Sequence, residues 1–211
     1  MNIYMFFQHG EKVFRHGRDL PHWQQVGTIQ FITFRLADAM PQKKLTNWKE
    51  ERDSWLAWNP KPWSDRQQNE HRRLFHDKLE EWLDEGAGSC LLAEKSKREI
   101  IEEVLMKAHG NKAHFESFVI MPNHVHLLVQ PFVELEKLIK IWKGVSARKI
   151  GKGSIWQGNY RDTMIRDAEH FRNTVRYIRK NPKHLKSEEF TLWEGKSAKT
   201  IPSLEQGHFC P

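Results

Sequence analysis

The sequence is poor in cysteine and in long apolar runs. Its 211 residues include only two cysteines, Cys90 and Cys210, with no Cys-x-x-Cys pair. This argues against a disulfide framework and against a structural zinc knuckle. The early apolar run at residues 3–7 is too short for the core of a signal peptide or for a spanning helix. With 38% hydrophobic and 29% charged residues, we expect a soluble, cytoplasmic protein of one domain (1–211), with no membrane partner.

The positive charge is concentrated in one part of the chain. The formal net charge is +7, and residues 137–183 alone hold thirteen Lys or Arg against three Asp or Glu. A basic region of this kind is typical of a surface that binds a polyanion, because neutralising phosphates releases condensed counterions. The alternative is a lysine-rich solvated surface without a partner.

Hydrophobic periodicity predicts an α+β protein with a ferredoxin-like antiparallel sheet, in the order βαββαβ. An insertion that holds five of the nine tryptophans follows the first strand and is predicted to be helical. A last helix follows the sheet elements. The predicted segments are a polar N-terminal arm (1–26), a strand (27–36), the helical insertion (41–90), a helix (100–108), two strands (114–121 and 124–130), a helix (135–145), a strand (160–166), the C-terminal helix (167–180) and an unassigned tail (185–211).

Two histidines, His124 and His126, alternate with apolar residues in a predicted strand. Because successive side chains on a strand point to opposite faces, both imidazoles share one face while Val125 and Leu127 face the core. Two such imidazoles can bind one metal ion. The alternative is a pair of exposed strand histidines, and a metal site would need a third ligand from elsewhere.

The helix predicted at 167–180 can supply that ligand together with a nucleophile. Tyr177 lies about 125° from the middle of the apolar stripe of this helix, so it is poorly placed to be core. Asn181 follows about 40° round the helix from Tyr177. The alternatives are an interfacial aromatic at Tyr177 and a simple C-terminal cap at Asn181. The chain has only three tyrosines, and Tyr160, in a predicted strand, is the fallback nucleophile.

Three motifs together resemble the HUH single-tyrosine transposases, and most of all the REP-associated tyrosine transposases. They are Met-Pro-Asn-His-Val-His-Leu-Leu-Val at 121–129, Ile-Trp-Gln at 155–157 and Arg-Tyr-Ile-Arg-Lys-Asn-Pro at 176–182. The resemblance implies that His124, His126 and Asn181 bind a divalent metal, Mg²⁺ or Mn²⁺, and that Tyr177 is the catalytic nucleophile. Many relatives have glutamine where this chain has Asn181, so the shorter side chain is expected to hold the ion less firmly.

The activity that the resemblance implies is transposition, through cleavage and rejoining of single-stranded hairpin DNA from repetitive palindromes (REP elements). The tyrosine displaces a 3′ oxygen and becomes a 5′-phosphotyrosine, and the reverse step joins a new strand without a nucleotide cofactor. Whether the chain acts as a homodimer, and whether it is an active transposase or a domesticated copy, stays open.

The basic segment supplies six candidates for contacts to DNA phosphates. They are Lys140, Lys143, Arg148, Lys149, Arg161 and Arg172. Trp142 or Trp156 could stack on bases, although Trp142 falls on the apolar stripe of its helix. Two other functions remain open, namely a DNA-binding protein of this fold without catalysis and a metal-dependent phosphodiesterase that uses water.

Overall fold

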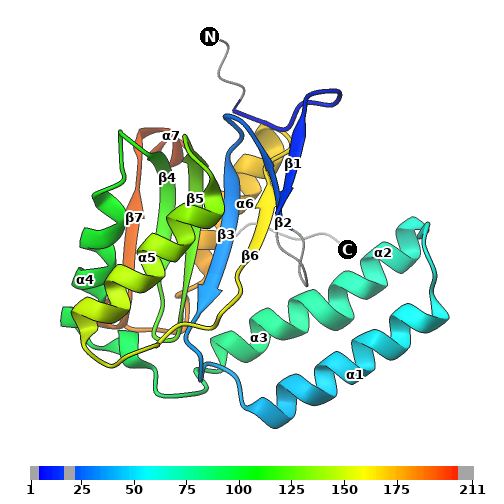
Figure 1. Cartoon of the computed structure of the whole chain (residues 1–211), viewed down its shortest axis with the longest axis horizontal. Coiled ribbons are helices and arrows are strands. Elements are labelled where there is room, and N and C mark those ends of the chain that lie inside the picture. The colour runs from blue at the N-terminus through cyan, green and yellow to red at the C-terminus, as the bar shows by residue number, and fades with distance from the viewer. Residues whose placement is uncertain (1–4, 17–21, 204–211) are drawn as a thin grey trace.

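The computed structural model describes residues 5–16 and 22–203, in which a five-stranded antiparallel sheet carries helices on both faces (Figure 1). A second, two-stranded sheet lies beside it, and a helical hairpin projects away from it. The strands are β1 (Val13–His16), β2 (His22–Gln25), β3 (Gln30–Arg35), β4 (Ala113–Ile120), β5 (His124–Pro131), β6 (Arg161–Met164) and β7 (Thr191–Glu194).

The order of strands in the main sheet is β6-β3-β5-β4-β7, and every neighbouring pair is antiparallel. Along the chain, β3, α4 (Lys95–Met106), β4, β5, α5 (Leu135–Ile150) and β6 follow one another in the βαββαβ order. This is the ferredoxin-like arrangement, extended by β7 at one edge. The fold class predicted from the sequence is confirmed.

The two faces of the main sheet have separate cores. On one face α4 and α5 pack apolar residues spaced by three and four positions, such as Ile101, Val104 and Leu105, against the sheet. On the other face α6 (Ala168–Lys180) buries Phe171, Val175 and Ile178. The first turn of α6 is capped by Asp167, whose carboxylate accepts from the His170 N–H at 2.7 Å. Figure 1 shows α6 behind the sheet, with α4 and α5 in front.

The insertion is helical and forms a hairpin that leaves the end of β3 (Figure 1). Its base packs Leu45, Leu79 and Leu83 into the core under α4 and α5. Its far end is exposed, and Trp58 is 85% accessible. Within 5–16 and 22–203, no helix combines the length and the apolar character needed to cross a bilayer. The hairpin consists of α1 (Gln42–Trp58), α2 (Asp65–His71), a π-helical turn (Arg72–Asp77) and α3 (Lys78–Asp84).

Two strands lie in the described part of the predicted N-terminal arm (1–26), where the sequence pattern predicts none. β1 and β2 pair as an antiparallel hairpin. The Phe7 N–H also donates to the Ile165 carbonyl (2.9 Å), and the Ile29 N–H to the Met5 carbonyl (2.9 Å). These polar segments are ordered by backbone hydrogen bonds to the sheet, which hydrophobic periodicity does not reveal. Residues 1–4 and 17–21 of the predicted arm lie outside the described ranges.

The tail docks on the sheet through β7, which pairs with β4. Trp193 on β7 stacks on Phe118, with ring centroids 5.3 Å apart and planes within 9°. A 3-10 turn (Ser187–Glu189) precedes β7 and α7 (Lys196–Lys199) follows it. The part of the predicted tail beyond residue 203 lies outside the described residues.

Candidate functional site

The histidine pair lies on the face of the sheet that α6 covers. In the register of β3 and β5, His126 is opposite Thr33 and His124 is opposite Arg35. Both imidazoles are fully buried, and the His126 ring stacks on Phe31 with centroids 5.4 Å apart. The Nε2 atoms of the two rings are 3.0 Å apart. The strand alternation predicted from the sequence thus brings two ring nitrogens face to face.

Each histidine is held by a hydrogen bond at its other ring nitrogen. His124 Nδ1 lies 2.7 Å from Asn123 Oδ1, and His126 Nδ1 lies 2.8 Å from the Thr33 hydroxyl. Such bonds fix the orientation of a ring and leave Nε2 to face a ligand. Sequence reasoning missed both partners. The only sign in the sequence that Asn123 is a partner of His124 is its position next to that residue. Thr33 can be recognised as the partner of His126 only once the register of β3 and β5 is known.

Asn181, at the C-terminal end of α6, reaches the same pair of rings. Its amide Nδ2 is 3.3 Å from His126 Nε2. Its Oδ1 is buried and has no hydrogen-bond partner. Because rotation of an amide by 180° exchanges its oxygen and nitrogen, the oxygen can face the histidines instead. Two imidazole nitrogens and one amide oxygen then form a donor set that suits a divalent cation.

The third donor of this set is an amide rather than a carboxylate. Among the residues that the structure describes, no group of three or more His, Cys, Asp or Glu side chains is arranged to hold a metal ion. Asn181, which reaches His126, is therefore the candidate for a third ligand beside His124 and His126. An uncharged donor binds a hard cation less strongly than a carboxylate does.

Tyr177 stands beside the histidines on the solvent side of the site. Its ring packs edge-on against His126, with centroids 5.4 Å apart, and against Phe31, with centroids 5.7 Å apart. Its accessible fraction is 36%. The backbone of α6 spaces Tyr177 and Asn181 by one turn, and the Asn181 N–H donates to the Tyr177 carbonyl at 3.0 Å. The predicted nucleophile and the predicted third ligand therefore meet the histidine pair together.

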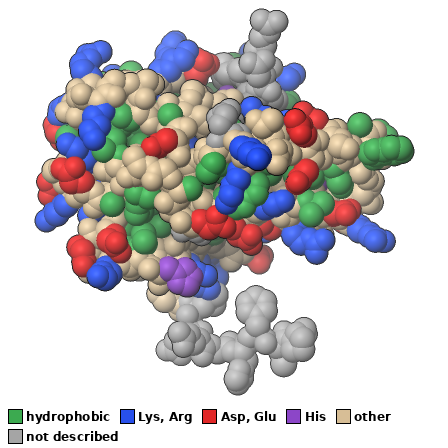
Figure 2. Space-filling view, turned by 90° about the horizontal axis from the view of Figure 1, so that it is seen from below, with side chains coloured by type: hydrophobic (Ala, Val, Ile, Leu, Met, Phe, Trp, Pro, Cys, Tyr) green, Lys and Arg blue, Asp and Glu red, His purple; other side chains and the backbone are tan. Residues whose placement is uncertain are grey.

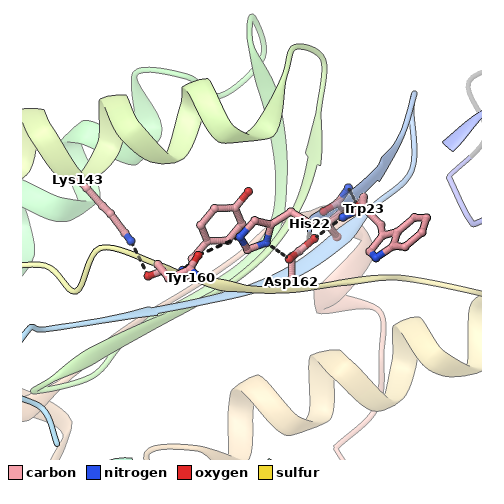
Figure 3. A network of polar contacts seen from close by, with 7 residues as sticks. His22, Trp23, Lys143, Tyr160 and Asp162 are labelled. Atoms are coloured by element: carbon pink, nitrogen blue, oxygen red, sulfur yellow. Dashed lines mark hydrogen bonds and ion pairs between the residues drawn. The ribbon is translucent and has the colours of Figure 1, made fainter. Parts of the chain in front are cut away.

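Tyr160, the fallback nucleophile, does not share this site. It is buried in the core under α4 and α5, on the other face of the sheet. Its ring stacks on His22, with centroids 3.8 Å apart (Figure 3). Burial and the nearby carboxylates, first among them Asp162, raise the pKa of the Tyr160 hydroxyl. A buried phenol that resists ionisation is a poor nucleophile, so the structure corrects this alternative.

Four of the six predicted phosphate ligands lie on α5, which covers the face of the sheet opposite the histidines. Lys140 pairs with Glu136 at 2.8 Å and Lys149 with Glu103 at 2.6 Å. Lys143 donates to the carbonyls of Gln157 (2.9 Å) and Asn159 (2.8 Å), and burial lowers its pKa to about 8. Lys140, Lys143, Arg148 and Lys149 are thus not neighbours of Tyr177. Helical periodicity places them away from the core but does not reveal which face of the sheet the helix covers.

The other two predicted cations differ from each other. Arg161 on β6 lies opposite Thr33 in the strand register and so shares the histidine face. Arg172 is exposed on α6, about 140° round the helix from Tyr177. The face seen from below mixes Lys and Arg with Asp and Glu side chains (Figure 2). Of the six predicted cations, Arg161 is thus the one that the strand register places on the face of the histidines.

The two tryptophans proposed as stacking partners are buried. Trp142 is 2% and Trp156 5% accessible, and both belong to the core under α4 and α5. The Trp156 indole N–H donates to the Ser146 hydroxyl at 2.8 Å. They pack the core and do not offer a face to bases, which corrects that prediction.

Two comparisons with known proteins found similar proteins. Residues 90–181 match the family described as IS200-like transposases. A solved structure described as the REP-associated tyrosine transposase bound to a REP hairpin is similar at 16% identity, over 80% of this chain and 75% of that chain, with a TM-score of 0.46. The search of curated proteins gave no significant match. His124, His126, Tyr177 and Asn181 all lie within the segment that is similar to the IS200-like transposases.

Proposed function

We propose that this protein cleaves and rejoins single-stranded DNA, with Tyr177 as the nucleophile. The observation that supports this is the packing of Tyr177, which is 36% accessible, against the ring of His126. The Nε2 atom of that ring faces His124 Nε2 at 3.0 Å. An accessible phenol next to a pair of metal-binding nitrogens is the arrangement that a phosphoryl transfer to tyrosine requires.

His124, His126 and Asn181 would hold a Mg²⁺ or Mn²⁺ ion in this proposal. The unpartnered, buried Oδ1 of Asn181 and the facing Nε2 atoms support this ligand set. When bound, the ion would offset the negative charge of the phosphodiester and orient it. Thr33 and Asn123 would keep the rings of the two histidines in place.

Tyr177 forms the covalent bond. Its oxygen attacks the phosphorus in line with the 3′ oxygen, so one O–P bond forms and the bond to the 3′ oxygen breaks. The phenol loses its proton and the departing 3′ oxygen gains one, which leaves a 5′-phosphotyrosine and a 3′ hydroxyl. Since the number of phosphoester bonds is unchanged, a 3′ hydroxyl can reverse the step and join a strand without an added energy source.

The Tyr177 ring makes edge-on contacts with both Phe31 and His126. These contacts limit the motion of the Tyr177 side chain, so less conformational freedom is lost when its oxygen aligns for attack on the phosphorus. Arg161, on the same face of the sheet, is the cation that we assign to the phosphates flanking the cleaved bond. Hairpins of REP elements, the substrates implied by the sequence motifs, are the DNA class that we propose.

We further propose that residues 1–211 act as one transposase domain. The base of the insertion shares the core under α4 and α5, and β7 of the tail extends the same sheet. Neither segment is therefore a separate folding unit in this proposal.

Incubation of the protein with single-stranded hairpin DNA and Mn²⁺, followed by a denaturing gel, tests the proposal. The wild-type chain should yield a protein–DNA adduct, Tyr177→Phe should yield none, and the matched control Tyr160→Phe should retain it. Cleavage that persists in Tyr177→Phe without an adduct would favour a phosphodiesterase that uses water. Binding without cleavage in all three proteins would favour a non-catalytic DNA-binding protein.

A further inference from the structure

Asn123 lies between the helical insertion and His124, and it is 1% accessible. Its amide Nδ2 donates to the carbonyls of Leu83 (3.0 Å) and Ala87 (3.3 Å). These carbonyls belong to the end of α3 and to the loop that follows it. Both hydrogens of the amide are thereby used, so Oδ1 is fixed as the atom that faces His124 Nδ1 at 2.7 Å.

This arrangement selects one tautomer of His124. An amide oxygen has no hydrogen and can only accept, so His124 Nδ1 must donate. A neutral imidazole with its proton on Nδ1 carries a lone pair on Nε2. That nitrogen is the one that faces His126. The Thr33 hydroxyl, which contacts His126 Nδ1, can donate as well as accept and imposes no such choice.

The loop that holds Asn123 is itself fixed to the end of β3. The Ser89 N–H donates to the Asp38 carboxylate at 2.8 Å. Gly88, at a φ of +92°, lies so close that a Cβ there would be 2.4 Å from the Asp38 carbonyl oxygen. On its other side, Asn123 accepts from the Leu36 N–H through its own carbonyl at 2.8 Å. The position of the loop therefore depends on how the insertion sits against β3.

We propose that Asn123 is a positioning residue. Through Asn123, the packing of the helical insertion against the end of β3 determines whether His124 Nε2 carries the lone pair that binds a metal ion. When the insertion is packed against the end of β3, the Leu83 and Ala87 carbonyls hold the Asn123 amide. The amide oxygen then keeps the proton of His124 on Nδ1, which leaves the lone pair on His124 Nε2. When the loop moves away, the amide is released and His124 can adopt the other tautomer. The proposal rests on the proposed role of His124 as a ligand. In this proposal the insertion has a function at the site, because metal binding by His124 depends on the packing of the insertion against the end of β3.

The first test is the tautomer of His124 in the metal-free protein, measured by NMR with ¹⁵N-labelled histidine. The wild-type chain should carry the proton on Nδ1, and a proton on Nε2 would overturn the proposal without any variant. Asn123→Ala should lose the preference for Nδ1. Asn123→Asp keeps an acceptor toward His124 but has no donor for Leu83 and Ala87, so it should keep the tautomer while hydrogen exchange in the 83–89 loop accelerates.

The second test perturbs the loop at a distance from the histidines. Gly88→Ala should displace the loop from Asp38, weaken the Nδ1 preference and lower the affinity for Mn²⁺, measured by calorimetry. Loss of an outer partner of a metal ligand typically costs about 10–100-fold in affinity. Gly151→Ala is the matched control, because it also has a positive φ (+78°) but its Cβ would meet nothing within 4 Å.

The outcomes separate the two proposals. A Gly88→Ala protein with the wild-type tautomer and the wild-type Mn²⁺ affinity would overturn the coupling. A wild-type chain that shows the Nδ1 tautomer but binds no Mn²⁺ would instead count against the proposed metal-dependent function. If Gly88→Ala fails to fold, the difference between Asn123→Ala and Asn123→Asp still decides whether Asn123 sets the tautomer.

Discussion

Tyr177 packs edge-on against His126, with ring centroids 5.4 Å apart and planes at 75°. The two residues are 51 positions apart in the sequence and lie on α6 and β5. Their contact joins the nucleophile to the metal-binding pair that we propose. It also places the phenol at the solvent boundary of an otherwise buried site, where a DNA strand can reach it.

The amide of Asn181 should control metal affinity. Asn181→Ala removes the third donor, so Mn²⁺ affinity measured by calorimetry should fall at least about tenfold, the loss that removal of even an outer partner typically causes. Asn181→Asp supplies a carboxylate, which hard cations prefer, and should bind Mn²⁺ at least as tightly as the wild type. Asn173→Ala, on an exposed part of the same helix, is the control. Equal affinity in Asn181→Ala and the wild type would exclude Asn181 as a ligand.

Arg161 should contribute to DNA binding, whereas Lys140 should not. Arg161 shares the face of the histidines, and Lys140 lies on α5 and pairs with Glu136. Binding of single-stranded DNA, followed by fluorescence anisotropy over a series of salt concentrations, measures this. Loss of one phosphate contact in Arg161→Ala should reduce the slope of log affinity against log salt by about 0.7. A larger reduction for Lys140→Ala would show that the DNA runs over the α5 face instead.

Arg98 should be important for stability. It is 1% accessible and donates to the carbonyls of Leu92 (2.8 Å), Ala93 (2.6 Å) and Glu188, and to the Thr191 hydroxyl (3.3 Å). Burial lowers the pKa of the guanidinium. Because Arg98→Met leaves these acceptors without a donor, the free energy of unfolding should fall by about 2–4 kcal/mol.

Urea unfolding of Arg98→Met measures this loss. Arg148→Met is the control, because Arg148 is an exposed cation on α5 and surface changes usually stay within about 0.5 kcal/mol. Similar small effects in both variants would mean that the carbonyls around Arg98 find water when the guanidinium is removed.

His22 should make stability depend on pH. Its Nδ1 is 2.5 Å from Asp162 Oδ1 and its Nε2 is 2.9 Å from Asn159 Oδ1 (Figure 3). Asn159 Oδ1 also accepts from the Tyr160 N–H, so both ring nitrogens face acceptors, which favours the protonated form of the ring. Burial lowers the pKa of His22, but the hydrogen bonds and charge of Asp162, with Asn159, raise it above its ordinary value of 6.5.

A raised pKa in the folded state stabilises the fold where the imidazole is charged. The stabilisation by His22 is fully present below about pH 6.5, the ordinary pKa, and is lost as the pH rises through the raised value. The difference in unfolding free energy between the wild type and His22→Gln should therefore shrink with increasing pH. A difference that grows with pH would contradict a charged His22 ring that donates hydrogen bonds from both of its nitrogens.

The sequence predicted the parts of the fold that depend on periodicity. Alternation along β5 placed His124 and His126 on one face, and the stripe on α6 placed Tyr177 and Asn181 together on one flank. Both inferences need only the geometry of a single element. The βαββαβ order followed from the sequence of such elements.

The sequence could not predict relations between elements. The face of the sheet that α5 covers is set by the connection of the strands. Lys140 and Lys149, candidates for phosphate contacts from the sequence, therefore lie on the face opposite Tyr177. Asn123 follows a proline, and the pair indicates a turn, which hides its contacts with the insertion. Arg98 is a charged residue in an amphipathic helix, where burial is the less common outcome.

The most direct test of the proposed chemistry locates the covalent bond. After reaction with single-stranded hairpin DNA and Mn²⁺, the protein is digested and its peptides are sequenced by tandem mass spectrometry. We expect a nucleotide, attached through its 5′ phosphate, on Tyr177 and on no other residue, and we expect none when the metal is chelated. A nucleotide attached to Tyr160 or to another side chain, or cleaved DNA with no modified peptide, would contradict the proposed role of Tyr177.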